Sequence, residues 1–100
     1  MRWAVVKDFP NYEISDNGDL RVIETHKLVK KQYRRDFNYV RVQYQLYNKD
    51  LMKTRRAHRL VGDAFITKPE SNEKLMIKHI DRNPLNNHFS NLEWVPALGW

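Results

Sequence analysis

The sequence predicts an α+β fold in which small antiparallel hairpins pack around one central helix. Short stretches alternate apolar and polar residues, most clearly at residues 39–47, and this is the period of a half-buried strand. One stretch, residues 57–65, changes to helical spacing, with apolar residues at i, i+3, i+4, i+7 and i+8. With 100 residues, of which 41% are hydrophobic, the chain has the size of one domain with a modest core.

The first part of the chain is predicted to contain short paired strands. Residues 3–7 and residues 12–15 have strand character, and residues 20–22 are expected to return as a partner strand. Asn17-Gly18 between them is a favoured pair in tight turns whose two central residues need positive φ. Residues 25–38 are polar and basic, and they fit either short strands or a loop.

The second part is predicted to hold a hairpin, the helix and two further strands. Residues 39–47 and 51–56 form the hairpin, with one apolar and one basic face. Thr54 is a candidate N-cap for the helix, and Pro69 prevents its continuation. Beyond the helix, the pattern predicts a strand at residues 75–80, a loop rich in Asn, Asp and Pro at residues 81–87, and a last strand at residues 92–95.

Composition excludes several classes of protein. The chain has no cysteine, so it has neither disulfides nor thiolate zinc sites, and its four histidines alone do not make the usual structural zinc site. Its apolar runs are too short to span a membrane. It begins Met1-Arg2-Trp3 without an apolar signal core, which predicts a cytoplasmic protein.

The positive charge is concentrated in the middle of the chain. The net charge is +6, but residues 21–59 alone hold twelve basic and three acidic side chains. A basic segment with interleaved tyrosines suits a DNA phosphate backbone, whereas the alternative is a solvated surface that keeps the protein soluble. The candidate nucleic-acid-binding residues are Lys30, Lys31, Arg34, Arg35, Arg41, Lys53, Arg55, Arg56 and Lys78.

Residues 78–95 contain the best candidates for catalytic or metal-ligating side chains. His79 is predicted at a strand end, Asp81 follows two positions later, and four asparagines lie in the loop and the return. A neutral imidazole near pH 7 accepts a proton from water, and asparagine carbonyl oxygens ligate hard cations. Asparagines also build ordinary tight loops, so an inert loop fits the same residues equally well.

A family resemblance favours the reactive interpretation. The segment is similar to the core motif of HNH homing-type endonucleases, and two earlier blocks resemble elements that precede that motif in the family. The core block comprises His79, Asp81, Asn83, Asn86-Asn87 and Asn91-Leu92-Glu93-Trp94-Val95; the helix block is His58-Arg59-Leu60-Val61 with Ala64-Phe65; the N-terminal block is Trp3, Tyr12-Glu13-Ile14-Ser15 and Gly18. Three matches in this order span nearly the whole chain.

The resemblance implies a layout and a mechanism. Residues 1–100 would form a single domain, with a basic β-rich module at residues 1–56. The helix and an HNH-like core would follow at residues 57–100, ending in a truncated ββ-metal finger. His79 matches the general base that activates water for attack on a phosphodiester, and Asn87 matches the asparagine that supports the histidine's loop. The implied cofactor is a divalent metal, Mg²⁺ or Mn²⁺, bound to the scissile phosphate.

Two departures from the family pattern concern this metal. Lys78 stands where the family commonly has an Asp or Asn ligand, and a protonated amine does not ligate a cation. Trp100 falls near the position of the second ligand and has no suitable lone pair. Asp81 and His88 are candidates for a substitute site, so the metal ligands stay unassigned.

Three functions from different classes remain. The first is an HNH-endonuclease-like DNA-binding protein with weak or lost metal-dependent cleavage, which Lys78 and Trp100 favour. The second is an active nicking or homing endonuclease with His79 as its base. The third is a small phage-encoded inhibitor or adaptor that binds a host protein.

Overall fold

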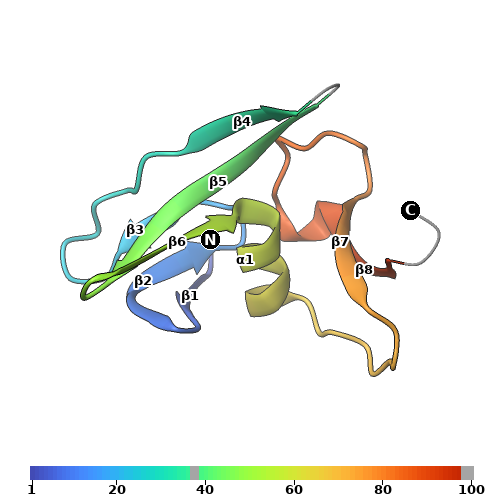
Figure 1. Ribbon diagram of the computed structural model, residues 1–100, viewed down its shortest axis with the longest axis horizontal. Coiled ribbons are helices and arrows are strands. Elements are labelled where there is room, and N and C mark those ends of the chain that lie inside the picture. Colours follow the sequence, from blue (N-terminus) through green and yellow to red (C-terminus); the bar gives the residue numbers. More distant parts are fainter. Residues whose placement is uncertain (37–38, 98–100) are drawn as a thin grey trace.

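The computed structural model describes residues 1–36 and 39–97, where three antiparallel sheets surround one α-helix (Figure 1). The helix, α1 (Ala57–Phe65), lies between the N-terminal strands and the C-terminal hairpin. Short antiparallel hairpins around a single helix confirm the predicted α+β class. None of the helices in these ranges is long and apolar enough to cross a membrane.

The first sheet contains β1 (Trp3–Val6), β2 (Phe9–Ser15) and β3 (Leu20–Val22), in that order. The turn between β2 and β3 differs from the prediction, because Gly18 has a positive φ of 89° and Asn17 does not. The buried Ser15 explains this difference. Its Oγ accepts hydrogen bonds from the backbone N–H groups of Asn17 (3.2 Å) and Asp19 (2.9 Å), which closes a wider turn over residues 16–19.

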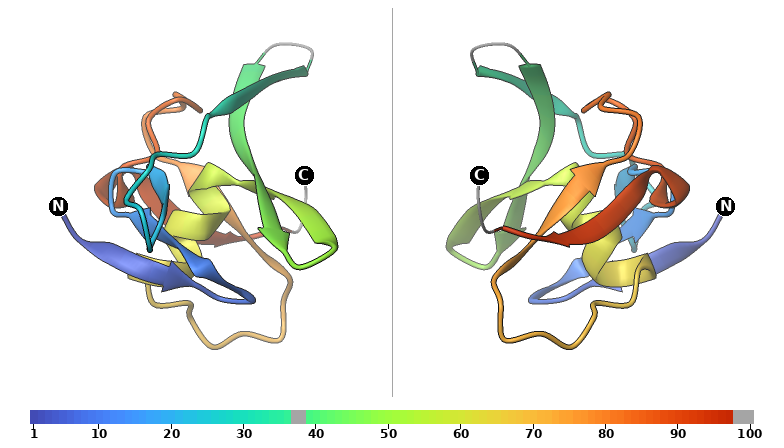
Figure 2. Two further views of the ribbon diagram at one scale, coloured as in Figure 1. Left: turned by 90° about the vertical axis from the view of Figure 1, so that its left-hand side faces the viewer. Right: turned by 90° about the vertical axis from the view of Figure 1, so that its right-hand side faces the viewer.

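The second sheet contains β4 (Gln32–Asp36), β5 (Tyr39–Asn48) and β6 (Leu51–Arg56). The predicted hairpin of residues 39–56 is confirmed, and β4 adds a third strand from the stretch for which the sequence left two choices. Val42, Tyr44 and Leu46 are buried on the inner face of β5, so alternation places Arg41 and Gln43 on its outer face. In Figure 2, the end of β4 and β5 projects from the rest of the molecule.

The helix follows the predicted bounds, but its N-cap does not. Thr54 lies within β6 and pairs with Gln45, so the cap prediction is wrong. Arg56 occupies the N-cap position and makes no side-chain cap bond. The helix is instead held by its buried face, which includes Leu60 and Val61.

The third sheet is a hairpin of β7 (Leu75–His79) and β8 (Leu92–Pro96), with the short 3-10 helix η1 (Phe89–Asn91) before β8. It packs on α1 where Gly62 leaves room for Ile77, and Trp94 Nε1 donates to Ile66 O at 3.0 Å. One core cluster joins all three sheets, because Ile14, Tyr44 and Ile77 belong to it together with α1.

Two leucines near the turn of the β5–β6 hairpin, one on each strand, provide a test of this core. Leu46 is fully buried, whereas Leu51 in the paired strand is 49% exposed. Leu46→Ala is expected to lower the free energy of unfolding by about 2–5 kcal/mol, because it leaves a cavity in the core. Leu51→Ala should cost well under about 1 kcal/mol. Urea unfolding of the two variants checks this, and equal losses would contradict the described burial.

Candidate functional site

The central contact of the candidate site joins His79 to Asn87. His79 is the last residue of β7, and its Nε2 lies 2.7 Å from Asn87 Oδ1. Asn87 is only 7% exposed, so its amide is held within the loop. An amide oxygen only accepts, and therefore Nε2 carries the hydrogen while Nδ1 keeps a lone pair. The geometry gives His79 a nitrogen that is able to accept a proton.

The asparagines build the loop that brings Asn87 to His79. The Asp81 carboxylate accepts hydrogen bonds from Asn83 N (2.7 Å), Asn91 Nδ2 (2.9 Å) and Asn86 Nδ2 (3.0 Å). These bonds, led by the one from the Asn83 backbone, lower the pKa of Asp81. The buried Asn91 also accepts from Asp81 N at 3.0 Å. Asp81 therefore shapes the loop.

His79 opens onto a basic groove of about 520 Å³. Its described lining contains four cationic side chains and two histidines, and none of its residues is acidic. The cations come from three strands and the loop after β7: Arg41, Arg56, Lys78 and Arg82. Arginine and lysine side chains that line one groove suit an anion with several oxygens, such as a phosphate.

His58 of α1 forms the second histidine of the groove. Its ring centroid is 5.2 Å from that of His79, with 49° between the ring planes. Burial, followed by the charges of His79, Arg56, Arg59 and Arg41, lowers the pKa of His58 to about 4. His58 is therefore neutral at pH 7 and packs against His79 without adding charge.

The described residues around His79 do not fit a divalent cation. Lys78 Nζ lies 3.9 Å from Glu93 Oε1, its cross-strand partner, so this carboxylate is paired with an amine. His88 Nδ1 accepts from Ser90 N at 3.2 Å and caps η1. Within residues 1–36 and 39–97, no three His, Cys, Asp or Glu side chains are grouped as a metal site requires. Trp100 lies outside the described residues.

The strand register separates the candidate nucleic-acid-binding residues into two faces. Arg34 pairs with Arg41, and Arg56 pairs with Gln43, so these three arginines share the outer face of the second sheet. Arg41 and Arg56 also line the groove beside His79, and Lys78 joins them there from β7. The outer face and the groove thus form one surface, which we call the basic surface.

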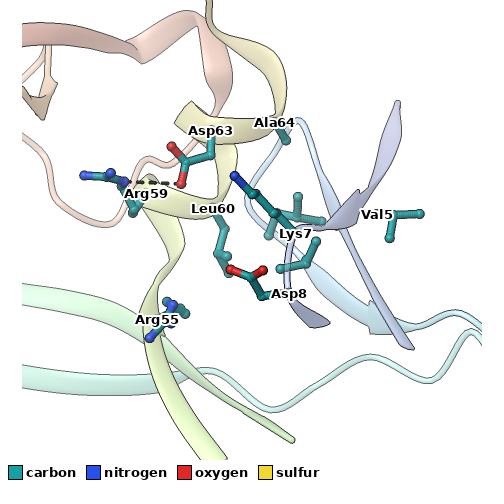
Figure 3. A pocket seen from close by; sticks show the side chains of 10 residues that line it. Val5, Lys7, Asp8, Arg55, Arg59, Leu60, Asp63 and Ala64 are labelled. Atoms are coloured by element: carbon teal, nitrogen blue, oxygen red, sulfur yellow. Dashed lines mark hydrogen bonds and ion pairs between the residues drawn. The ribbon is translucent and has the colours of Figure 1, made fainter. Parts of the chain in front are cut away.

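The other candidates lie elsewhere. Arg35, Lys53 and Arg55 pair with Val40, Leu46 and Tyr44, which places them on the opposite face of the sheet. Arg55 lines a separate pocket of about 410 Å³ between β1 and α1, beside the Arg59–Asp63 ion pair (Figure 3). Lys30 and Lys31 precede β4, and Lys31 Nζ lies 3.2 Å from Asp19 Oδ1.

Two ionisable residues of the groove were not among the predicted site residues. Arg82 belongs to the loop after His79, with a φ of 62°, and its closeness in sequence to His79 was the available signal. His58 precedes His79 by 21 positions, and only the packing of α1 on the C-terminal hairpin brings the two rings together.

A histidine at the end of a hairpin strand, held by an asparagine of the hairpin's own loop and backed by a helix, defines an HNH-type site. Two family models match accordingly: the NUMOD4 motif over residues 1–45 and HNH endonuclease over residues 55–98. The chain therefore belongs to the HNH endonuclease family and carries a NUMOD4 motif before its HNH region. The resemblance to homing-type enzymes is confirmed by the relatives described next.

An uncharacterized HNH endonuclease, L245, of Acanthamoeba polyphaga mimivirus is 37% identical over 94 residues, which are 94% of this chain and 27% of that protein. DNA endonuclease I-HmuI of Bacillus phage SP01 is 34% identical over 95% of this chain and 52% of its own length. A solved structure titled "DNA binding and cleavage by the HNH homing endonuclease I-HmuI" has a TM-score of 0.84 and 31% identity, over 96% of this chain and 53% of that one. The chain thus spans about half or less of these relatives.

The pKa of His58 makes the stability of the fold depend on pH. Its folded value of about 4 lies below the ordinary 6.5, so the unfolded chain binds a proton first as the pH falls. The contribution of the neutral His58 ring to the free energy of unfolding is therefore complete above pH 6.5. It is lost as the pH falls from 6.5 to 4. Over that window, the native protein should lose on the order of 2 kcal/mol more unfolding free energy than His58→Gln.

Urea unfolding at several pH values measures this difference. The exposed His26 provides the control, because His26→Gln should keep the native pH dependence. Parallel pH profiles for the native protein and His58→Gln would show that His58 titrates normally.

Proposed function

We propose that the chain binds DNA through the basic surface, and that its metal-dependent phosphodiester cleavage is weak or lost. The observation that carries the proposal is the groove beside His79, in which Arg41, Arg56 and Lys78 converge. Its relative I-HmuI is described as a DNA endonuclease, which supports DNA as the partner. No relative named above is described by a protein partner, so the host-protein hypothesis lacks support.

The charge pattern of the second sheet supports a polyanionic ligand. Arg34 and Arg41 lie directly opposite each other across β4 and β5, which concentrates basic side chains on the outer face of the sheet. Gln32 and Gln43 extend the same face with amides that both donate and accept, and Gln43 Nε2 donates to Gln32 Oε1 at 3.4 Å. A phosphate backbone that binds this face would release its own condensed counterions.

The surroundings of His79 support weak or lost cleavage. In the family pattern, a metal polarises the phosphate and stabilises the leaving oxygen. Here Lys78 occupies the position before the base, and the oxygens of Asp81 already accept three hydrogen bonds within the loop. The described residues therefore bind and orient a phosphate better than they hold a cation beside it.

An active nicking or homing endonuclease is the second candidate, and the His79–Asn87 pair favours it. The pair keeps the geometry of a general base, since Asn87 Oδ1 fixes the hydrogen on Nε2 and leaves Nδ1 able to take a proton from water. In this function, His79 and Asn87 would be the reactive pair and Mg²⁺ or Mn²⁺ the cofactor. Measured cleavage separates the two candidates.

Two neighbouring arginines test the binding surface. Arg56 lies on the basic surface, whereas Arg55 lies on the opposite face over the Phe9 ring, 5.7 Å from its centroid. Arg56→Ala is expected to weaken duplex binding and to lower the slope of log affinity against log salt by about 0.9, the loss of one phosphate contact. Arg55→Ala should leave the slope unchanged. Fluorescence anisotropy over a salt series measures both.

Equal losses in the two arginine variants would contradict binding by the outer face. Binding that does not respond to salt would contradict a phosphate-backbone ligand altogether. Lys78→Ala provides a further check, because it should weaken binding in the same way as Arg56→Ala.

Supercoiled plasmid incubated with Mg²⁺ or Mn²⁺ tests cleavage. The native chain and His79→Ala are expected to give the same or nearly the same low level of nicked circles, with EDTA as the blank. Calorimetric titration of the protein with either metal should show no binding at millimolar concentration. Nicking that is strong and lost in His79→Ala would establish the active endonuclease instead.

A further inference from the structure

We propose that Tyr44 and Gly18 are positioning residues for the His79–Asn87 pair, so that the N-terminal sheets set the geometry of the HNH base. Tyr44 belongs to the second sheet and Gly18 to the turn of the first sheet, and neither residue lines the basic groove. The structural part of the proposal stands on contacts alone. Its consequence for a reaction or a bound phosphate rests on the proposed function.

The first contact is the approach of Gly18 to Asn87. A β-carbon added to Gly18 would lie 2.8 Å from Asn87 Cβ and 3.4 Å from Asn87 O. No real side chain tolerates the shorter distance, so the glycine α-carbon fills the space directly behind Asn87. The positive φ of Gly18, 89°, gives a second reason why glycine stands there. Asn87 therefore rests on the turn between β2 and β3.

The second contact fixes that turn. Tyr44 OH donates to Gly18 O at 2.6 Å, and the Tyr44 side chain is fully buried. Burial raises the pKa of the Tyr44 phenol, so the hydroxyl stays protonated and remains a donor. A buried carbonyl that loses its donor costs free energy, so the bond holds the Gly18 peptide in one orientation. The rigid phenol ring of Tyr44 thus fixes the turn relative to β5.

A third contact joins the same turn to the segment that follows Asn87. Phe89 N donates to Asp16 O at 2.8 Å, and Asp16 N donates to Arg2 O at 3.0 Å. Asn87 therefore packs against Gly18, and two residues after it the backbone of Phe89 is hydrogen-bonded to the same turn. The remaining freedom of Asn87 is small, and its Oδ1 is directed to His79 Nε2, 2.7 Å away.

These contacts form a path from β5 to the base. Tyr44 faces inward from β5, and Arg41 of the same strand lines the groove beside His79. One strand therefore places both a groove cation and the support of the histidine's partner. The hydrogen on His79 Nε2, and hence the lone pair on Nδ1, depends on this support.

The test compares two tyrosine-to-phenylalanine variants, each of which loses one hydrogen bond, buried for Tyr44 and partly buried for Tyr12. Tyr44→Phe removes the donor to Gly18 O, whereas Tyr12→Phe removes the acceptor of Tyr47 N, a bond of 3.2 Å that is remote from the groove. Nitrogen-15 NMR of the histidine rings reports the tautomer of His79, and the side-chain amide signal of Asn87 reports its environment. Both variants should unfold at somewhat lower urea than the native protein.

In Tyr44→Phe, the two ring-nitrogen signals of His79 are expected to move towards each other, as a mixture of tautomers requires, and the Asn87 amide signal should shift. In Tyr12→Phe, both should keep their native positions. Native His79 and Asn87 signals in Tyr44→Phe, or the same change in both variants, would overturn the proposal.

Gly18→Ala is the second variant, and its added methyl group should displace Asn87 and change the same signals more strongly. Native signals in a folded Gly18→Ala protein would also overturn the proposal, and the tyrosine pair decides if that protein does not fold. Duplex binding by the native chain is measured in parallel. A native chain that binds no DNA would contradict the proposed function and leave the NMR comparison intact.

Discussion

The hydrogen bond between His79 Nε2 and Asn87 Oδ1 depends on several distant segments of the chain, which position its two side chains. His79 is the last residue of β7, and Asn87 lies in the loop of residues 80–88. Asp81 and Asn91 close that loop from within, and the turn of residues 16–19 supports it from outside. A tautomer fixed by a buried amide needs such support, because a loop alone would let the ring and the amide separate. The N-terminal sheets thus serve the site as well as the core.

The second constraint is electrostatic. Arg41 and Arg56 from the second sheet meet Lys78 and Arg82 from the C-terminal hairpin in one groove. All four side chains are positively charged, and Lys78 also lies beside Glu93 of the paired strand. His58 adds no charge, because its burial favours the neutral ring. The groove therefore presents positive charge to an anion, which is the physical basis of the proposed DNA contact.

Local pattern predicted the elements well and their junctions poorly. Periodicity predicts the observed bounds of α1 and β6, and the motif around His79 contains Asn87, which contacts the His79 ring. The N-cap prediction for Thr54 is wrong, because β6 continues through Thr54 to Arg56 and α1 begins only at Ala57.

Contacts between distant segments had no local signal at all. Arg55 and Arg56 are adjacent in sequence, yet strand alternation sends them to opposite faces, and only the register with β5 shows which face is which. His58 and Gly18 reach the site by tertiary packing.

The proposed weak cleavage is compatible with a well-ordered contact between His79 and Asn87. Guanidinium and ammonium groups bind the charged oxygens of a phosphodiester already in its ground state, and the part of this binding that is equal in the transition state raises affinity without raising the rate. A metal acts differently, because it gains most from the charge that develops on the leaving oxygen. On the proposed function, a groove with Lys78 and Arg82 beside an ordered His79 is therefore suited to binding DNA more than to cleaving it.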